Sequence, residues 1–149
     1  MLTPLTGDRM KTFGDPNAKE CNVITCFSKK THFDTWFTNG KHEGHCDAPV
    51  EKGGGDAGFG PHELLEAALA SCLNIWVRVS AQNHNIPLAG VVTDVTLERQ
   101  NPGEVVFRYA LELKGPLTEE QRWELIQAAQ SCPVHQTLAG KTSFTCLPA

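Results

Sequence analysis

Residues 61–83 have the sequence PHELLEAALASCLNIWVRVSAQN, and this stretch decides the fold. Pro61 suits the first position of a helix, and the segment from Pro61 to about Asn83 is the longest helical candidate in the chain. Its apolar residues fall on nearly all sides of the predicted helix. A helix of this kind belongs in the interior of the molecule or at an interface between subunits.

Three strand-like segments precede this helix. Cys21–Phe27 alternates between two faces, and His32–Thr38 is rich in aromatic and β-branched residues. Asn39-Gly40 follows, a pair that suits a type I′ hairpin turn because both residues tolerate positive φ. The returning strand is therefore predicted from Lys41 to about Asp47.

Further strands and helices follow the long helix. In order, they are predicted strands at Val91–Glu98 and Val105–Leu113, a helix from Thr118 to about Gln130, a short helix from Pro133 to about Leu138, and a strand at Lys141–Leu147. Thr118 and Gln121 have the spacing of a capping box, and Trp123, Ile126 and Ala129 supply an apolar stripe for the second helix. This order of elements predicts an α+β fold.

The length and composition fit one ordinary globular domain. The chain has 149 residues, of which 40% are hydrophobic and 20% charged. We therefore predict a single domain over residues 1–149, in which residues 1–20 form an irregular arm. The net charge of -4, without long runs of Lys or Arg, argues against nucleic acid or an anionic membrane surface as a partner.

The N-terminus shows no apolar signal-peptide core, and the most apolar charge-free stretch, Ala67–Val77, is far shorter than the roughly 20 residues that span a bilayer. We therefore expect a cytoplasmic protein. In a reducing compartment, the six cysteines are expected to be buried apolar residues, metal ligands or catalytic thiols rather than a disulfide scaffold.

Two of these cysteines have informative positions. Cys72 lies in the middle of the long helix among small apolar residues, where a packed core cysteine is the simpler interpretation. Cys132 directly precedes Pro133 and is expected at the N-terminus of a new helix. The unpaired N–H groups there favour a thiolate and lower the pKa, so the local sequence points to Cys132 as the more reactive thiol.

Other patterns give weaker signals. The segment His42-Glu43-Gly44-His45-Cys46 contains three potential zinc ligands, but no C-x-x-C or H-x-x-x-H completes a tetrahedral set. The glycine-rich connector at residues 49–60 matches neither a P-loop nor a dinucleotide-binding motif, which favours a tightly bending loop over a phosphate site. Cys21 and Cys146 fall on predicted strands, as small core residues would.

Three segments together resemble the OsmC/Ohr family. Residues 61–72, PHELLEAALASC, look like its P-x-E-L-L-x-A-A-x-x-x-C helix, and residues 131–138, SCPVHQTL, resemble its second motif, C-P-V-x-x-T-L. The segment from Pro49 to Gly54 is similar to P-x-E-x-G-G of the Ohr branch. The resemblance extends from about Phe33 to the C-terminus, and the paired cysteine motifs are specific.

The resemblance implies an intertwined homodimer with two central helices packed on six-stranded sheets. It also implies thiol-dependent reduction of organic hydroperoxides, with hydrogen peroxide as a second candidate substrate, without a bound cofactor. Cys72 is then the peroxidatic nucleophile, which forms a sulfenic acid, and Cys132 is the resolving thiol that traps it as a disulfide. An external dithiol, for which a lipoyl protein is one candidate, regenerates the enzyme.

In the Ohr branch, an arginine held by a glutamate activates the nucleophile. Glu51 matches the glutamate of P-x-E-x-G-G, and Arg9 in Thr6-Gly7-Asp8-Arg9 looks like the arginine of the family's T-G-x-R. The separation of Arg9 from Glu51 departs from the family pattern. The family also includes an OsmC-like subgroup that keeps the cysteines without a clear arginine, so redox sensing or binding of an apolar ligand or electrophile is the alternative function.

Overall fold

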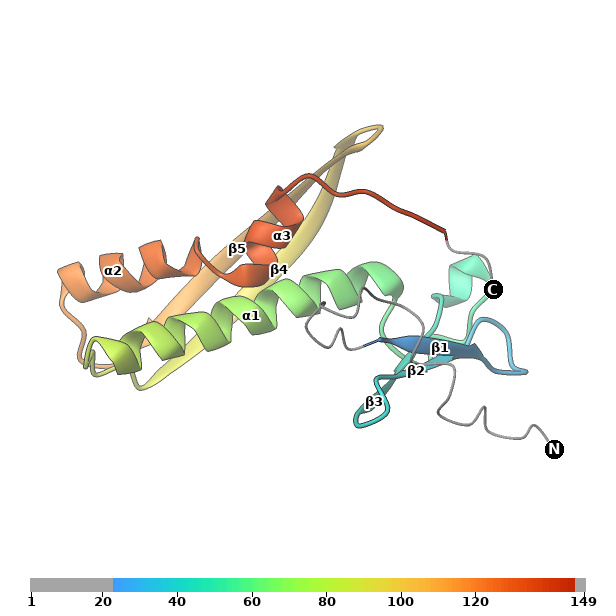
Figure 1. The fold of residues 1–149 in the computed structure, drawn as a ribbon, viewed down its shortest axis with the longest axis horizontal. Helices are drawn as coiled ribbons and strands as arrows, with labels where there is room; N and C mark the ends of the chain where they lie inside the picture. Colours follow the sequence, from blue (N-terminus) through green and yellow to red (C-terminus); the bar gives the residue numbers. More distant parts are fainter. Residues whose placement is uncertain (1–22, 147–149) are drawn as a thin grey trace, which may run out of the picture. The chain divides into compact units, whose positions relative to one another are not determined.

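The computed structural model describes residues 23–146 and shows an α+β fold with antiparallel sheets, which confirms the predicted class (Figure 1). Its elements are, in order, β1 (Thr25–Ser28), β2 (Thr35–Thr38), β3 (Glu43–Cys46), the 3₁₀ helix η2 (Val50–Lys52), α1 (Pro61–Asn83), β4 (Gly90–Asn101), β5 (Glu104–Lys114), α2 (Glu119–Ala129) and α3 (Pro133–Ala139).

The chain divides into two compact units at the start of α1. Unit 1 extends to Pro61 and contains the sheet β1-β2-β3, whereas unit 2 begins at His62 and contains the hairpin β4-β5 and the three α-helices. The single domain over residues 1–149 stays a prediction. So do the six-stranded sheets and the intertwined dimer, because the described part of one chain holds sheets of three and two strands.

In unit 1, the three predicted strands are confirmed in shorter form, and Cys21 lies outside the described residues. The Asn39-Gly40 hairpin is also present, but its turn differs from the predicted type I′. Only Gly40 has positive φ (85°), while the Asn39 side chain accepts hydrogen bonds from the backbone N–H groups of Lys41 (3.0 Å) and His42 (2.7 Å). Asn39 therefore stabilises the turn through its amide rather than through a left-handed backbone.

In unit 2, α1 confirms the predicted long helix and provides most of the core. Leu69, Leu73, Val77 and Ala81 recur every fourth residue and are buried, so they lie on one face of the helix. Large apolar side chains also remain exposed on this helix: Leu65, Ile75 and Val79. By length and composition alone α1 could cross a membrane, but a core helix of a soluble protein has the same properties.

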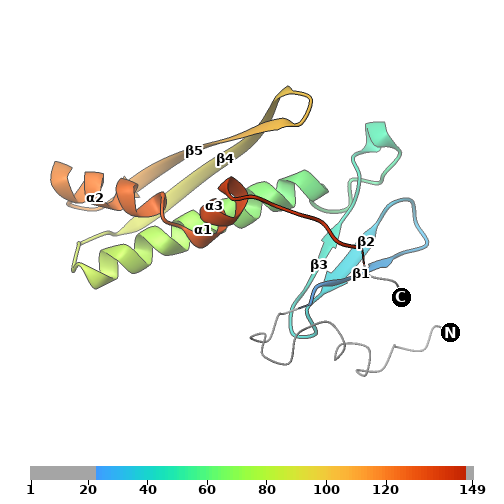
Figure 2. The same cartoon turned by 45° about the horizontal axis from the view of Figure 1, so that its top comes forward.

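The hairpin β4-β5 confirms both predicted strands, and Gly103 has the positive φ (82°) of its turn. Two side chains of α1 bind the backbone of β4. The Glu66 carboxylate accepts from the N–H of Leu97 (2.6 Å), and the Asn74 amide donates to the carbonyl of Val91 (2.9 Å). The long helix therefore lies along the hairpin, as Figures 1 and 2 show.

The predicted capping box of α2 is confirmed, with the Thr118 hydroxyl accepting from the N–H of Gln121. The predicted apolar stripe is partly wrong. Ala129 is buried, but Trp123 and Ile126 are exposed, and Leu125 is the other buried residue of the helix. Leu125 and Ala129 are four residues apart, so they face the core together.

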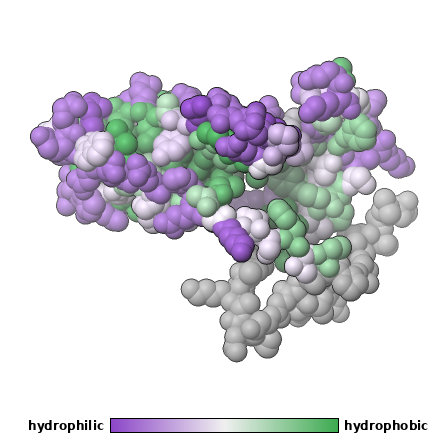
Figure 3. All heavy atoms as spheres, turned by 90° about the horizontal axis from the view of Figure 1, so that it is seen from above, coloured by the Kyte–Doolittle hydropathy of each residue, from purple (hydrophilic) through white to green (hydrophobic). Residues whose placement is uncertain are grey.

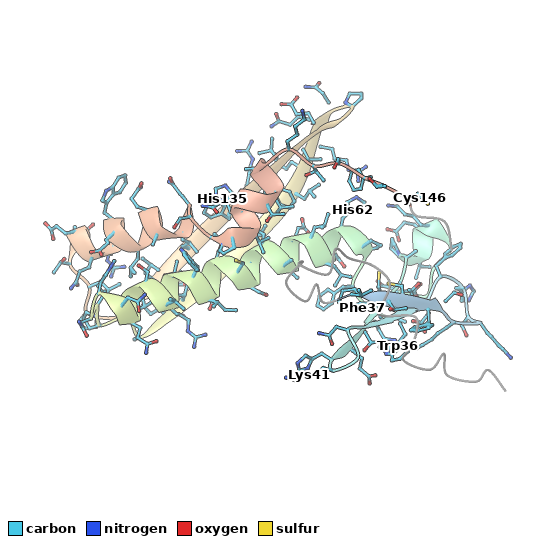
Figure 4. The ribbon with its side chains drawn as sticks, in the orientation of Figure 1. Trp36, Phe37, Lys41, His62, His135 and Cys146 are labelled. Carbon is cyan, nitrogen blue, oxygen red and sulfur yellow. The ribbon has the colours of Figure 1, made fainter. Side chains whose placement is uncertain are left out.

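The short helix α3 is confirmed, whereas the predicted strand at Lys141–Leu147 is wrong for its described part. Residues 141–146 form no strand. Cys146, expected in the core, is exposed (Figure 4). The alternating pattern of this segment suits a strand, but a strand also needs a neighbouring strand edge to pair with.

Candidate functional site

The site centres on the contact between α1 and the turn that joins α2 to α3. Cys72 lies near the middle of α1, immediately before the buried Leu73. Its side chain is partly buried and packs against the core. Cys72 therefore contacts the protein interior while part of the residue stays exposed.

Cys132 is the N-cap residue of α3 and is fully buried, with 0% of its surface exposed. The turn around it is held by backbone hydrogen bonds. Its N–H donates to the carbonyl of Ala129 (3.1 Å), and its own carbonyl accepts from the N–H of Gln136 (3.0 Å). Pro133 occupies the first turn of α3, as the sequence predicts.

The two cysteine side chains are neighbours, close enough for Cys72 to act on the pKa of Cys132. Burial raises the pKa of the Cys132 thiol, and the neighbouring Cys72 thiol raises it further. The side chain forms no capping hydrogen bond, yet the backbone amides of His135 and Val134 still lower the pKa. Burial and Cys72 outweigh these amides, so the pKa lies above the ordinary value of cysteine.

This result corrects the lowered pKa predicted for Cys132 from its place at a helix start. The sequence pattern located the N-terminus of α3 correctly, but it contained no information on burial. Desolvation disfavours the thiolate more than two nearby amides favour it. The degrees of burial are also reversed, because Cys132 is the core residue and Cys72 the partly accessible one.

Residues that the sequence analysis did not assign hold the turn before Cys132. The indole N–H of Trp76 on α1 donates to the hydroxyl of Ser131 (3.0 Å). His135 lies on α3 (Figure 4). Its Nδ1 atom lies 2.8 Å from the carbonyl oxygen of Gln130, and its ring meets that of Tyr109 edge to face. The sequence signal for these contacts was weak, since only the position of Trp76 one helical turn after Cys72 could have indicated that Trp76 lies near the cysteines.

Unit 2 contains both cysteines but neither of the other two predicted site residues. Glu51 belongs to unit 1, where it lies in η2 and is exposed. Arg9 lies outside the described residues. The structure therefore brings together Cys72 and Cys132, and the roles of Glu51 and Arg9 stay predictions.

The loop that carries Glu51 is held by Asp47. This carboxylate is buried, with 3% of the residue exposed, and accepts from the N–H groups of Ala48 (2.8 Å), Gly55 (2.9 Å) and Ala57 (3.2 Å). Desolvation opposes ionisation of Asp47, but these three donors prevail and lower its pKa. The glycine-rich connector is thus a folded loop around one carboxylate.

The candidate zinc ligands do not converge. The Nδ1 atom of His45 lies 3.0 Å from the Lys29 ammonium and 3.5 Å from the Asp34 carboxylate. Within residues 23–146, no three His, Cys, Asp or Glu side chains come together as a metal-binding group. The described residues therefore offer no ligand set for the zinc hypothesis.

A family model described as "OsmC-like protein" matches residues 53–146. The chain belongs to the OsmC-like family. The matched segment contains both cysteine motifs and begins just after Glu51. No curated protein matches the chain.

Solved structures of this family share the fold. An OsmC-like protein from Mycoplasma pneumoniae aligns with a TM-score of 0.68 and 21% identity, over 83% of this chain and 90% of its own. A putative osmotic stress induced and detoxification response protein from Psychrobacter arcticus gives 0.65 and 21%, over 81% and 90%. An organic hydroperoxide resistance protein from Legionella pneumophila gives 0.60 and 20%, over 83% and 92%. At this identity, the likeness establishes the OsmC-like fold.

Proposed function

We propose that this protein is a cysteine-based peroxidase that reduces organic hydroperoxides, and hydrogen peroxide as a further substrate. The observation that carries the proposal is the proximity of a partly accessible Cys72 to a fully buried Cys132. A peroxide can approach the first thiol from solvent, while the second is already within reach of the product. The family includes proteins described as organic hydroperoxide resistance proteins, which agrees with this chemistry.

The reaction has three steps. The Cys72 thiolate attacks the distal oxygen of the peroxide, so that an S–O bond forms, the O–O bond breaks and the alcohol leaves after taking a proton. The Cys132 sulfur then attacks the sulfenic sulfur, forming the disulfide and releasing water. An external dithiol reduces this disulfide by two exchange reactions and is itself oxidised.

Burial gives the two thiols different tasks. The raised pKa keeps Cys132 protonated at neutral pH, so it is a poor competitor for peroxide. Once Cys72 is a sulfenic acid, the departing hydroxide can take the Cys132 proton. The order of oxidation therefore follows from the unequal burial of the two sulfurs.

Arg9 and Glu51 are proposed to supply the activating charge. Attack on the O–O bond develops negative charge, which a guanidinium stabilises, and a carboxylate can hold that guanidinium in place. The ordered loop around Asp47 gives Glu51 a defined backbone position.

The proposed partners are a second copy of the chain and a dithiol reductant, for example a lipoyl protein, in the cytoplasm. The exposed apolar side chains of α1 support the homodimer, since Ile75 is 56%, Leu65 43% and Val79 40% exposed. Figure 3 shows apolar side chains among polar ones on the visible surface.

The test is consumption of cumene or tert-butyl hydroperoxide in the presence of a dithiol. We expect Cys72→Ser to abolish turnover. Cys26→Ser is the matched control, because it removes an exposed thiol on β1, and it should retain the wild-type rate. Undiminished turnover in Cys72→Ser would refute the proposal.

One observation favours a second function, redox sensing or capture of an electrophile. Within residues 23–146, the influences on the pKa of Cys132 are burial, Cys72 and two backbone amides, and none of these is a cation. A sensor would form the Cys72–Cys132 disulfide stoichiometrically without multiple turnover, so the same assay separates the two functions.

A further inference from the structure

A side-chain hydrogen bond ties together the two segments that carry the cysteines. Trp76 and Cys72 are four residues apart on α1, so they project from the same face of the helix. The Trp76 ring packs partly buried against the core, and its N–H reaches Ser131 across a sequence separation of 55 residues. Ser131 is the residue immediately before Cys132.

Ser131 is held by hydrogen bonds to two helices, α2 and α1. Its hydroxyl donates to the carbonyl of Ala128 (2.8 Å), and its backbone N–H donates to the same carbonyl (3.0 Å). A hydroxyl has one proton and two lone pairs, so donation to Ala128 leaves an acceptor site for the indole of Trp76. The end of α2 and the face of α1 together set the position of the backbone that leads into Cys132.

We propose that Trp76 and Ser131 are positioning residues that hold Cys132 within reach of Cys72 for disulfide formation. The inference rests on the proposed function for its peroxide step, whereas the geometry concerns any oxidation of this pair. Neither residue touches the reacting atoms in this role. Each acts through the backbone or helix that carries its neighbouring cysteine.

The step that depends on them is the second one. The Cys132 sulfur attacks the sulfenic sulfur of Cys72, the S–S bond forms and the S–O bond breaks. The hydroxide leaves with the Cys132 proton as water. The rate of such an intramolecular step follows the effective concentration of one group at the other. Loss of one hydrogen bond from the turn is expected to lower that concentration by about threefold to tenfold.

The first experiment is a redox equilibrium with glutathione, in which peptide mapping by mass spectrometry identifies the Cys72–Cys132 disulfide. Trp76→Phe and Ser131→Ala should each lower the effective concentration by about threefold to tenfold. The double variant should lose little more than Ser131→Ala alone, because both substitutions remove the Trp76–Ser131 bond and only Ser131→Ala also removes the bond to Ala128. A tenfold loss corresponds to a reduction potential about 30 mV higher.

Two variants control for effects on stability alone. Trp123→Phe makes the same substitution at an exposed tryptophan on α2 and should leave the equilibrium unchanged. Ser131→Thr keeps the hydroxyl and should restore the wild-type value. Folded Trp76→Phe and Ser131→Ala proteins with wild-type equilibria, or fully additive losses in the double variant, would overturn the inference.

The fraction of Cys72 sulfinic acid formed after reaction with peroxide reports on the rate of the second step. Reduced protein mixed with tert-butyl hydroperoxide should form Cys72 sulfinic acid in greater proportion in Trp76→Phe than in wild type, because the slower resolving step leaves the sulfenic acid exposed to a second peroxide. If peroxide does not react while the glutathione equilibrium shifts as expected, the proposed function fails and the positioning role stands. An unchanged sulfinic fraction at wild-type peroxide reactivity would refute the kinetic role.

Discussion

Replacing Cys132 by serine tests whether its buried sulfur has a chemical role. The side chain is fully buried, so the hydroxyl must be desolvated, which costs about 1–3 kcal/mol in proteins. Serine is also a preferred N-cap residue, and the amides of Val134 and His135 lie nearby, so a capping bond offsets about 0.5–2 kcal/mol. The net loss of unfolding free energy is expected to be about 1 kcal/mol.

The protein should therefore stay folded, with a melting temperature about 2–4 °C lower. Its chemistry should change much more. Without the resolving thiol, Cys72 stops at the sulfenic acid, and excess peroxide converts it to the sulfinic acid, a gain of about 32 Da. We expect steady turnover with a dithiol to fall at least about tenfold, since the regenerating reductant must then find a sulfenic acid in place of a disulfide.

The assay combines calorimetry, peroxide consumption and intact-protein mass spectrometry on Cys132→Ser. Wild-type turnover in a folded variant would show that Cys132 does not resolve the sulfenic acid. A stability loss above about 3 kcal/mol would show that the nearby amides do not satisfy the buried hydroxyl. The first result would refute the chemical role of Cys132, and the second would refute the expected capping hydrogen bond of the serine hydroxyl.

Three further predictions concern the core, the loop and the proposed dimer. Leu73→Ala removes a fully buried side chain and should lower the free energy of unfolding by about 2–5 kcal/mol in urea titrations; a loss below about 1 kcal/mol would contradict the described core. The lowered pKa of Asp47 means that its ionised form stabilises the fold above about pH 4 and that this contribution is lost as the pH falls through the folded-state pKa. Asp47→Asn should thus be less stable than wild type at neutral pH, and denaturation at several pH values should show that this difference in stability shrinks on acidification. A difference that stays constant with pH would show that the charge of Asp47 does not stabilise the loop. Ile75→Asp places a charge on the exposed apolar face of α1 and should yield monomers by light scattering, whereas an intact dimer would place the interface elsewhere.

The sequence predicted most secondary elements because their signals are local. Proline at the start of α1, the Thr118–Gln121 capping box and the alternation in β4 and β5 are each read within one segment. The errors occurred where the conformation or burial of a segment depends on residues distant in the sequence. The segment at residues 141–146 has a strand pattern without forming a strand, and the apolar stripe of α2 faced the core through Leu125 rather than Trp123.

The sequence by itself determined that this chain is an α+β member of the OsmC-like family with two cysteine motifs, because helix periodicity and motif spacing are properties of the chain. Tertiary structure alone decided which thiol is buried, since the burial of Cys132 depends on α1, α2 and α3 meeting. It also decided the direction of the Cys132 pKa, because desolvation and the Cys72 contact arise only when residues 60 positions apart in the chain come together. The hydrogen bond from Trp76 to Ser131 has the same origin, and no pattern within either segment contains it.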